Sequence, residues 1–202
     1  MTFDLQPTLQ NDLIKIVPLQ EQHFEALYRV ASDPLLWAQH PSSDRYQRPV
    51  FEIFFREALL SKGAFLVYNN TTAEVIGTSR YHDINEADNS ITIGYTFLSR
   101  ACWGGTYNKA LKTLMLDHAF THFTKAYFRI GENNIRSQKA VEKLGAIKTG
   151  HIENPSESQP KNKHFIYLLT KETWQKTNHP DTTNHHPHHF IVPPQKGNGI
   201  IQ

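Results

Sequence analysis

Two adjacent glycines, Gly104 and Gly105, stand between a strand-like and a helix-like segment, and this junction constrains the fold most. Before them, residues 90–98 (SITIGYTFL) alternate with the period of two of a half-buried strand. After them, apolar residues follow at helical spacing to about Phe123. Two glycines let the backbone approach a ligand closely, and the amides of roughly Gly104 to Asn108 suit a phosphate group. The alternative interpretation is a tight turn without a ligand.

The rest of the chain alternates between the two periodicities and predicts the order β α α β β β α β α β β. Strand patterns cover residues 13–17, 64–70, 74–82, 90–98, 126–131, 147–153 and 164–170. Helical patterns cover residues 19–32, 50–63, about 104–123 and 133–146, and a loop with one possible helical turn covers 33–49. This order predicts an α/β fold with a mixed sheet covered by helices on both faces.

Length and composition indicate one domain followed by an extension. The chain has 202 residues, of which 39% are hydrophobic, and this is enough for a core. We place the domain at residues 13–175, and we expect the Pro- and His-rich residues 176–202 to form a disordered extension. The net charge of +2 comes without a cluster of Lys and Arg, so we expect no nucleic-acid partner. No apolar run reaches membrane-spanning length, and a single cysteine suits a cytoplasmic protein.

Two common phosphate-binding motifs, G-x-x-x-x-G-K-[ST] and G-x-G-x-x-G, do not occur in the chain. Instead, residues 98–120 (LSRACWGGTYNKALKTLMLDHAF) and 131–146 (GENNIRSQKAVEKLGA) resemble the GNAT superfamily of N-acetyltransferases. The similarity is greatest to the branch of the ribosomal-protein alanine acetyltransferases. Its W-G-x-G-x-[AN], N-x-x-S and E-K-L-G motifs correspond to residues 103–108, 134–137 and 142–145. One position departs, because Thr106 replaces the second loop glycine.

The resemblance covers about residues 13–175 and implies a mixed, mostly antiparallel sheet of about seven strands. It implies that strands 90–98 and 126–131 splay apart and that acetyl-CoA, as co-substrate, lies between them. The implied reaction is direct transfer of an acetyl group to a primary amine, either of a small molecule or of a protein N-terminus, by a monomer or homodimer. The cofactor-binding residues that it implies are Phe97, Leu98, Arg100, Trp103, Gly104, Gly105, Thr106, Tyr107, Asn108, Asn134 and Ser137.

Acetyl transfer needs a donor for the leaving thiolate and an acceptor for the proton of the amine. The resemblance places Ser137 beside the sulfur, with Asn134 orienting the ligand, although Asn134 also reads as a helix N-cap. For the base we choose Glu153, with Glu157, the pair His82–Asp83 and a water chain as open alternatives.

Cys102 reads as a small apolar filler rather than a nucleophile, because no companion histidine is placed by the sequence. The extension contains His179, His185, His186, His188 and His189, but their spacing fits no structural zinc site, so we predict no metal. A second hypothesis is a GNAT-shaped module that binds CoA or a protein without catalysis. The identity of the acceptor and the length of the acyl group stay open.

Overall fold

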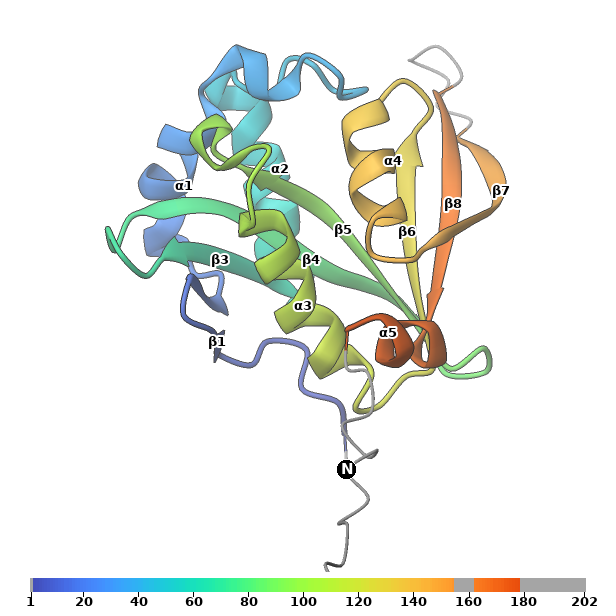
Figure 1. Cartoon of the computed structure of the whole chain (residues 1–202). Helices are drawn as coiled ribbons and strands as arrows, with labels where there is room; N and C mark the ends of the chain where they lie inside the picture. Colours follow the sequence, from blue (N-terminus) through green and yellow to red (C-terminus); the bar gives the residue numbers. More distant parts are fainter. Residues whose placement is uncertain (1, 155–161, 179–202) are drawn as a thin grey trace, which may run out of the picture.

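The computed structural model describes residues 2–154 and 162–178, and this part of the chain forms one eight-stranded sheet with five α-helices (Figure 1). The strands are β1 (Leu9–Gln10), β2 (Ile14–Pro18), β3 (Ala64–Asn69), β4 (Val75–Asn85), β5 (Ser90–Leu98), β6 (Lys125–Gly131), β7 (Ile147–Asn154) and β8 (Asn162–Thr170). The α-helices are α1 (Phe24–Ala31), α2 (Arg48–Leu60), α3 (Tyr107–Ala119), α4 (Ile135–Glu142) and α5 (Lys171–Asn178). Three 3₁₀ turns are η1 (Glu21–His23), η2 (Pro34–Trp37) and η3 (Arg100–Cys102).

The strands follow the order β1-β2-β3-β4-β5-β6-β8-β7, and β5 and β6 are the one parallel pair within the described residues. Pairing of β5 with β6 is confined to residues 90–92 and 125–127. Beyond this short stretch the two strands diverge, as Figure 1 shows. The predicted splay is therefore confirmed, and it opens the sheet beside the start of α3.

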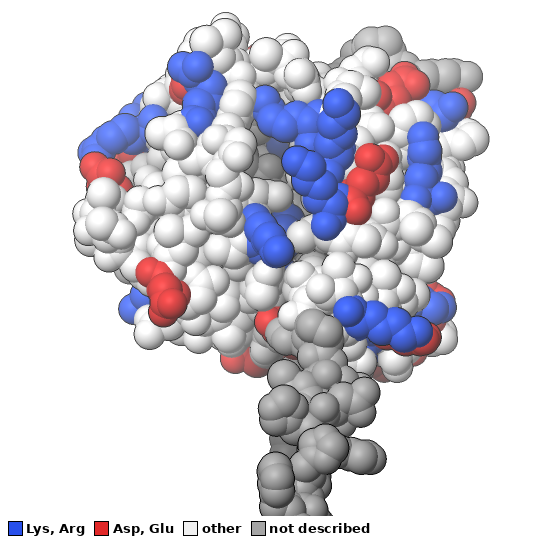
Figure 2. Space-filling model, in the orientation of Figure 1, with Lys and Arg blue, Asp and Glu red and all other residues white. Residues whose placement is uncertain are grey.

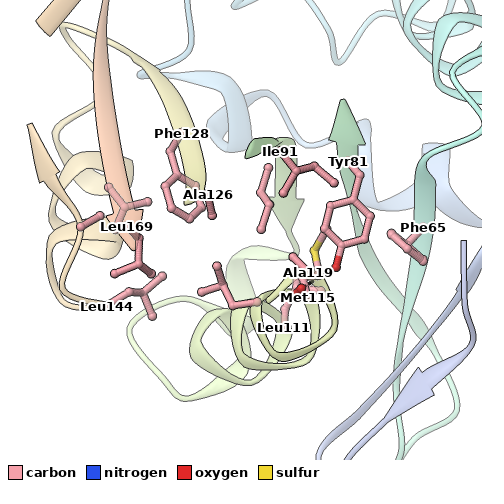
Figure 3. Packing of buried hydrophobic residues seen from close by; sticks show 14 of the residues in the cluster. Phe65, Tyr81, Ile91, Leu111, Met115, Ala119, Ala126, Phe128, Leu144 and Leu169 are labelled. Atoms are coloured by element: carbon pink, nitrogen blue, oxygen red, sulfur yellow. Dashed lines mark hydrogen bonds between the residues drawn. The ribbon is translucent and has the colours of Figure 1, made fainter. Parts of the chain in front are cut away.

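Helices cover both faces of the sheet, as predicted. On one face α3, α4 and α5 bury an apolar cluster that includes Ile91, Leu111, Met115 and Leu169 (Figure 3). On the other face α1 and α2 bury a second cluster, in which aromatic side chains such as Phe51 dominate. The two clusters hold the diverging strands in place from opposite sides.

The structure adds two elements that the sequence did not predict and shortens a third. The two-residue strand β1 precedes position 13, and α5 continues past position 175 to Asn178. Helix α3 ends at Ala119 rather than near Phe123, although Phe123 is buried. The single helical turn expected within residues 33–49 is η2. Most of the predicted extension, residues 179–202, lies outside the described residues.

None of the helices in the described ranges is both long and apolar enough to span a membrane.

Candidate active site

The glycine loop leads into α3, and the space around its two glycines is free of other atoms. Gly104 adopts a left-handed φ of +72°, and a Cβ added to Gly104 or Gly105 would meet no atom within 4 Å. Thr106 is helical (φ −86°, ψ −14°), and its side chain caps no amide among the described residues. The amides of the first turn of α3 therefore have no hydrogen-bond partner within the helix. They form the positive end of the helix dipole, and such an end favours a bound anion.

A cavity of about 480 Å³ lies against this loop, within the size range of ligand sites. Nine of the eleven predicted cofactor-binding residues line it: Phe97, Leu98, Trp103, Gly104, Gly105, Thr106, Asn108, Asn134 and Ser137. The other two lie elsewhere, since Arg100 forms an ion pair with Asp33 and the Tyr107 hydroxyl accepts a hydrogen bond from Asn69 (3.1 Å). The loop, the end of β5 and the start of α4 thus share one cavity.

Helix α4 forms the opposite wall and is held firmly in place. The Asn134 side chain caps it by accepting a hydrogen bond from the Ser137 amide (3.2 Å). The buried Gln138 amide donates to the carbonyls of Gly131 (3.1 Å) and Glu132 (2.8 Å), and so ties α4 to the end of β6. Asn134 is therefore an N-cap, and its capping fixes the first turn on which Ser137 lies.

Four basic side chains, Lys109, Arg136, Lys139 and Lys143, line the same cavity. Figure 2 shows Lys and Arg side chains gathered beside the hollow in the middle of this face. The Arg136 guanidinium carbon lies 3.6 Å from the centroid of the Trp103 ring, so it connects α4 with the glycine loop. The cavity is built for a ligand with several negative charges.

A second cavity, of about 160 Å³, adjoins the first. Eight residues line both, namely Trp37, His40, Thr96, Phe97, Asn108, Asn134, Ser137 and Ala140. The two cavities therefore meet at the divergence of β5 and β6, where two different ligands can touch.

Lys112 lines the smaller cavity and is a residue that the sequence analysis missed. Its side chain is 4% exposed, and its Nζ donates to Thr96 Oγ1 (2.6 Å) and Ser79 Oγ (3.3 Å). Burial lowers the pKa of Lys112 from 10.5 to about 7. A neutral Lys112 that donates both protons keeps its lone pair free to accept another. The available signal was its place in the apolar stripe of α3 that contains Leu111 and Met115.

Of the residues predicted as bases, the three that the structure describes, Glu153, His82 and Asp83, line neither cavity. Glu153 is on the edge strand β7 and lines neither cavity, and Glu157 lies outside the described residues. His82 is packed behind Gly94, since an added Gly94 Cβ would lie 2.6 Å from its Nε2. Burial lowers the pKa of His82, while Asp83 forms an ion pair with Arg129 (2.6 Å).

Two further titratable groups in the cavities are held neutral. Burial, aided by Arg45, lowers the pKa of His40 to about 3, so this imidazole is neutral at pH 7. Cys102 lines the larger cavity, and burial raises the pKa of its thiol. A thiol with a raised pKa is a poor nucleophile, and this supports the packing role expected for Cys102.

Comparison with known proteins gives the same fold. No curated protein matches the chain in sequence. A probable GNAT-family acetyltransferase from Chromobacterium violaceum ATCC 12472 is similar over 84% of this chain and 89% of its own, with 18% identity and a TM-score of 0.75. Mycobacterium smegmatis RimJ in complex with CoA-disulfide is similar over 79% and 82%, with 16% identity and a TM-score of 0.64. Vibrio cholerae spermidine N-acetyltransferase in complex with CoA and spermine is similar over 81% and 99%, with 14% identity and a TM-score of 0.63.

The family model described as the acetyltransferase (GNAT) domain matches residues 14–147, about two thirds of the chain. This segment contains the splayed strands, the glycine loop and α4. The chain belongs to the GNAT family of acetyltransferases, the N-acetyltransferases that use acetyl-CoA to acylate amines.

Proposed function

We propose that the larger cavity binds acetyl-CoA and that the smaller cavity binds a primary amine, which receives the acetyl group directly. The observation that carries this proposal is the shared wall of the two cavities. A thioester in one and an amine in the other meet at Thr96, Asn108 and Ser137. Holding two reactants in one geometry supplies a large part of the catalysis of such a reaction.

The residues of the larger cavity fit the co-substrate. The open Cβ positions of Gly104 and Gly105 leave room for a pyrophosphate against the first-turn amides of α3. Lys109, Lys139 and Lys143 supply positive charge for its phosphates. The carbonyl of Leu98 already accepts a hydrogen bond from the Trp103 indole (3.0 Å), and this bond fixes the strand end beside the cavity.

The amine acceptor is protonated at neutral pH and must lose a proton before it attacks. Lys112 accepts this proton as the general base, because the lone pair of its amine is free in the neutral form. Its pKa of about 7 allows it to accept and release protons near neutral pH. The neutral amine then attacks the thioester carbon, the C–N bond forms and the C–S bond breaks. The sulfur takes the electron pair of the C–S bond and leaves as a thiolate, to which the Ser137 hydroxyl donates a hydrogen bond. The second amine proton passes to solvent, which also protonates the released thiolate.

The Ser137→Ala variant tests whether Ser137 assists the departure of the thiolate. A donor that acts mainly on the developing thiolate lowers turnover and leaves acetyl-CoA binding unchanged. With a panel of primary amines and a free-thiol assay, we expect kcat to fall by roughly 10- to 100-fold and the Kd for acetyl-CoA to stay the same. Mass spectrometry of the products identifies the N-acetylated amine.

The control is Ser32→Ala, which removes an exposed hydroxyl bonded to the Arg29 carbonyl (3.0 Å) at the end of α1. Its kcat is expected to equal that of the wild type. Full turnover by Ser137→Ala would show that Ser137 serves only the start of α4.

A further inference from the structure

The smaller cavity has an unbalanced positive charge. Its basic lining residues are Arg45, Arg129 and Lys112, of which the two arginines carry the positive charge, and no Asp or Glu lines it within the described part of the chain. Arg129 is compensated by its ion pair with Asp83 (2.6 Å). Arg45 is not compensated in this way, since its Nη1 lies 3.3 Å from Nε2 of the neutral His40.

A second guanidinium group, that of Arg80, does not line the cavity but lies next to one of its lining residues, Tyr95. Arg80 on β4 is 5% exposed, and its Nε and Nη2 have no hydrogen-bond partner among the described residues. Its guanidinium carbon lies 4.1 Å from the centroid of the Tyr95 ring, and Tyr95 lines the cavity. Arg80 (5.6 Å) and Arg45 (4.8 Å) also lie over one ring, that of Phe54. Both guanidinium groups therefore lie close to Phe54, and of the two Arg45 lines the cavity.

Such a pair is costly without an anion. Burial lowers the pKa of both Arg45 and Arg80, which is the direction expected when a cation loses water without gaining a close counter-ion. Glu57 on α2 attracts both groups from an exposed position, but no ion pair within 4 Å joins either arginine to an acid among the described residues. A buried donor without an acceptor costs free energy that a ligand anion can recover.

We propose that the acceptor amine carries an anionic group, a carboxylate or a phosphate, which binds to Arg45 in the smaller cavity, while Arg80 beside Tyr95 strengthens the positive field there. This inference rests on the proposed function and narrows its substrate class. The planar guanidinium group matches both anions in a bidentate manner. The same positive field disfavours a second ammonium group, so it disfavours polyamines, and it favours the neutral, reactive form of the amine.

Matched acceptors test the proposal by catalysis. Linear ω-amino acids of three to six carbons, their uncharged amides, the corresponding aminoalkyl phosphates and the corresponding diamines are compared by thiol release from acetyl-CoA. At the best chain length we expect an anionic acceptor to exceed its amide in kcat/KM by roughly tenfold or more, with the diamine lowest. The carboxylate and phosphate series show which anion is preferred.

Variants connect the preference to the two arginines. Arg45→Gln and Arg80→Gln are expected to lower the ratio of kcat/KM for the anionic acceptor to kcat/KM for its amide by roughly tenfold. The control is Arg56→Gln, since Arg56 is exposed on α2 and lines neither cavity. Equal kcat/KM for amide and anionic acceptors, unaffected by the variants, would overturn the proposal.

Binding without turnover separates this inference from the proposed function. Glutarate and its uncharged diamide are titrated calorimetrically into protein saturated with CoA, which fills the other anion-binding cavity. We expect glutarate alone to bind, and Arg80→Gln to weaken it by roughly tenfold. If this holds while no amine releases thiol, the acetyl-transfer proposal fails and the anion site stands. If amines react but glutarate does not bind, the anion site is wrong.

Discussion

Lys112 is a basic residue at a position on α3 that packs like an apolar one. Its burial among Leu111, Met115 and Leu116 forces its pKa down, and the hydroxyls of Thr96 and Ser79 orient its amine into the smaller cavity. A charged lysine would be costly at this depth. The site thus keeps a poised amine at the expense of stability, which is typical of catalytic groups.

The Lys112→Met variant tests this position by stability and by activity. The folded-state pKa of about 7 lies below the unfolded value of 10.5, so between these values the unfolded chain binds more protons and wild-type stability rises with pH. Methionine removes this dependence. The stability of the variant relative to the wild type should therefore be highest at pH 7 or below and should decrease by more than about 1 kcal/mol by pH 9.5. Urea unfolding at pH 6.5 and 9.5 measures this difference.

The exposed Lys109 provides the control, because Lys109→Met should change stability equally at both pH values. In the activity assay, Lys112→Met should lower kcat/KM by roughly 100-fold and abolish the wild-type rise with pH near 7, whereas Glu153→Gln should change neither. A Lys112→Met variant with full activity would exclude Lys112 as the base.

At the level of elements, the sequence predicted most of the fold and brought out most of the residues of the glycine loop and the start of α4 that line the larger cavity. Long segments such as β5 and α3 can be recognised as strand or helix from the sequence. Each buries one whole face, so its apolar residues recur with the period of that secondary structure. The glycine loop and the cap of α4 are local features, readable from residues 103–108 and 134–137. Strand β1 was not predicted because two residues carry no periodicity. Helix α5 was not predicted because Trp174 is its one buried residue.

Trp174 connects α5 to the rest of the domain, so replacing it measures how much this short helix contributes to the free energy of unfolding. It is 1% exposed, and its indole nitrogen donates to Asp117 Oδ1 on α3 (2.7 Å). Trp174→Ala should lower the free energy of unfolding by about 3–5 kcal/mol. Trp174→Phe keeps an aromatic ring, loses the hydrogen bond, and should cost less. Acetyl-CoA affinity of the folded protein should not change, because Trp174 lines neither cavity.

Chemical denaturation monitored by far-ultraviolet circular dichroism measures both variants. A loss below about 1 kcal/mol for Trp174→Ala, the size of a surface substitution, would show that α5 does not stabilise the domain.

In the molecule as a whole, the smaller cavity, which we propose as the acceptor site, is assembled together with its surroundings from distant segments. Arg45 precedes α2, Arg80 lies on β4, Tyr95 on β5 and Lys112 on α3, and tertiary packing alone brings them together. No local spacing relates these residues, so the sequence analysis found none of them. The sequence instead favoured Glu153, which the topology places on the edge strand β7, away from the cavities. Much of the lining of the larger cavity was predictable because one loop and one helix start contribute it.

Calorimetric titration of acetyl-CoA into a variant of the glycine loop measures whether this loop binds the co-substrate. Gly105 suits this test better than Gly104, because Gly104 has a positive φ that strains any substitution. Gly105→Asp places a carboxylate in the larger cavity, where it repels phosphate. The control is Gly150→Asp on β7, where an added side chain also meets open space. We predict that Gly105→Asp weakens binding by roughly 100-fold or more, whereas Gly150→Asp binds like the wild type. Unchanged affinity in a folded Gly105→Asp variant would contradict the assignment of this cavity to acetyl-CoA.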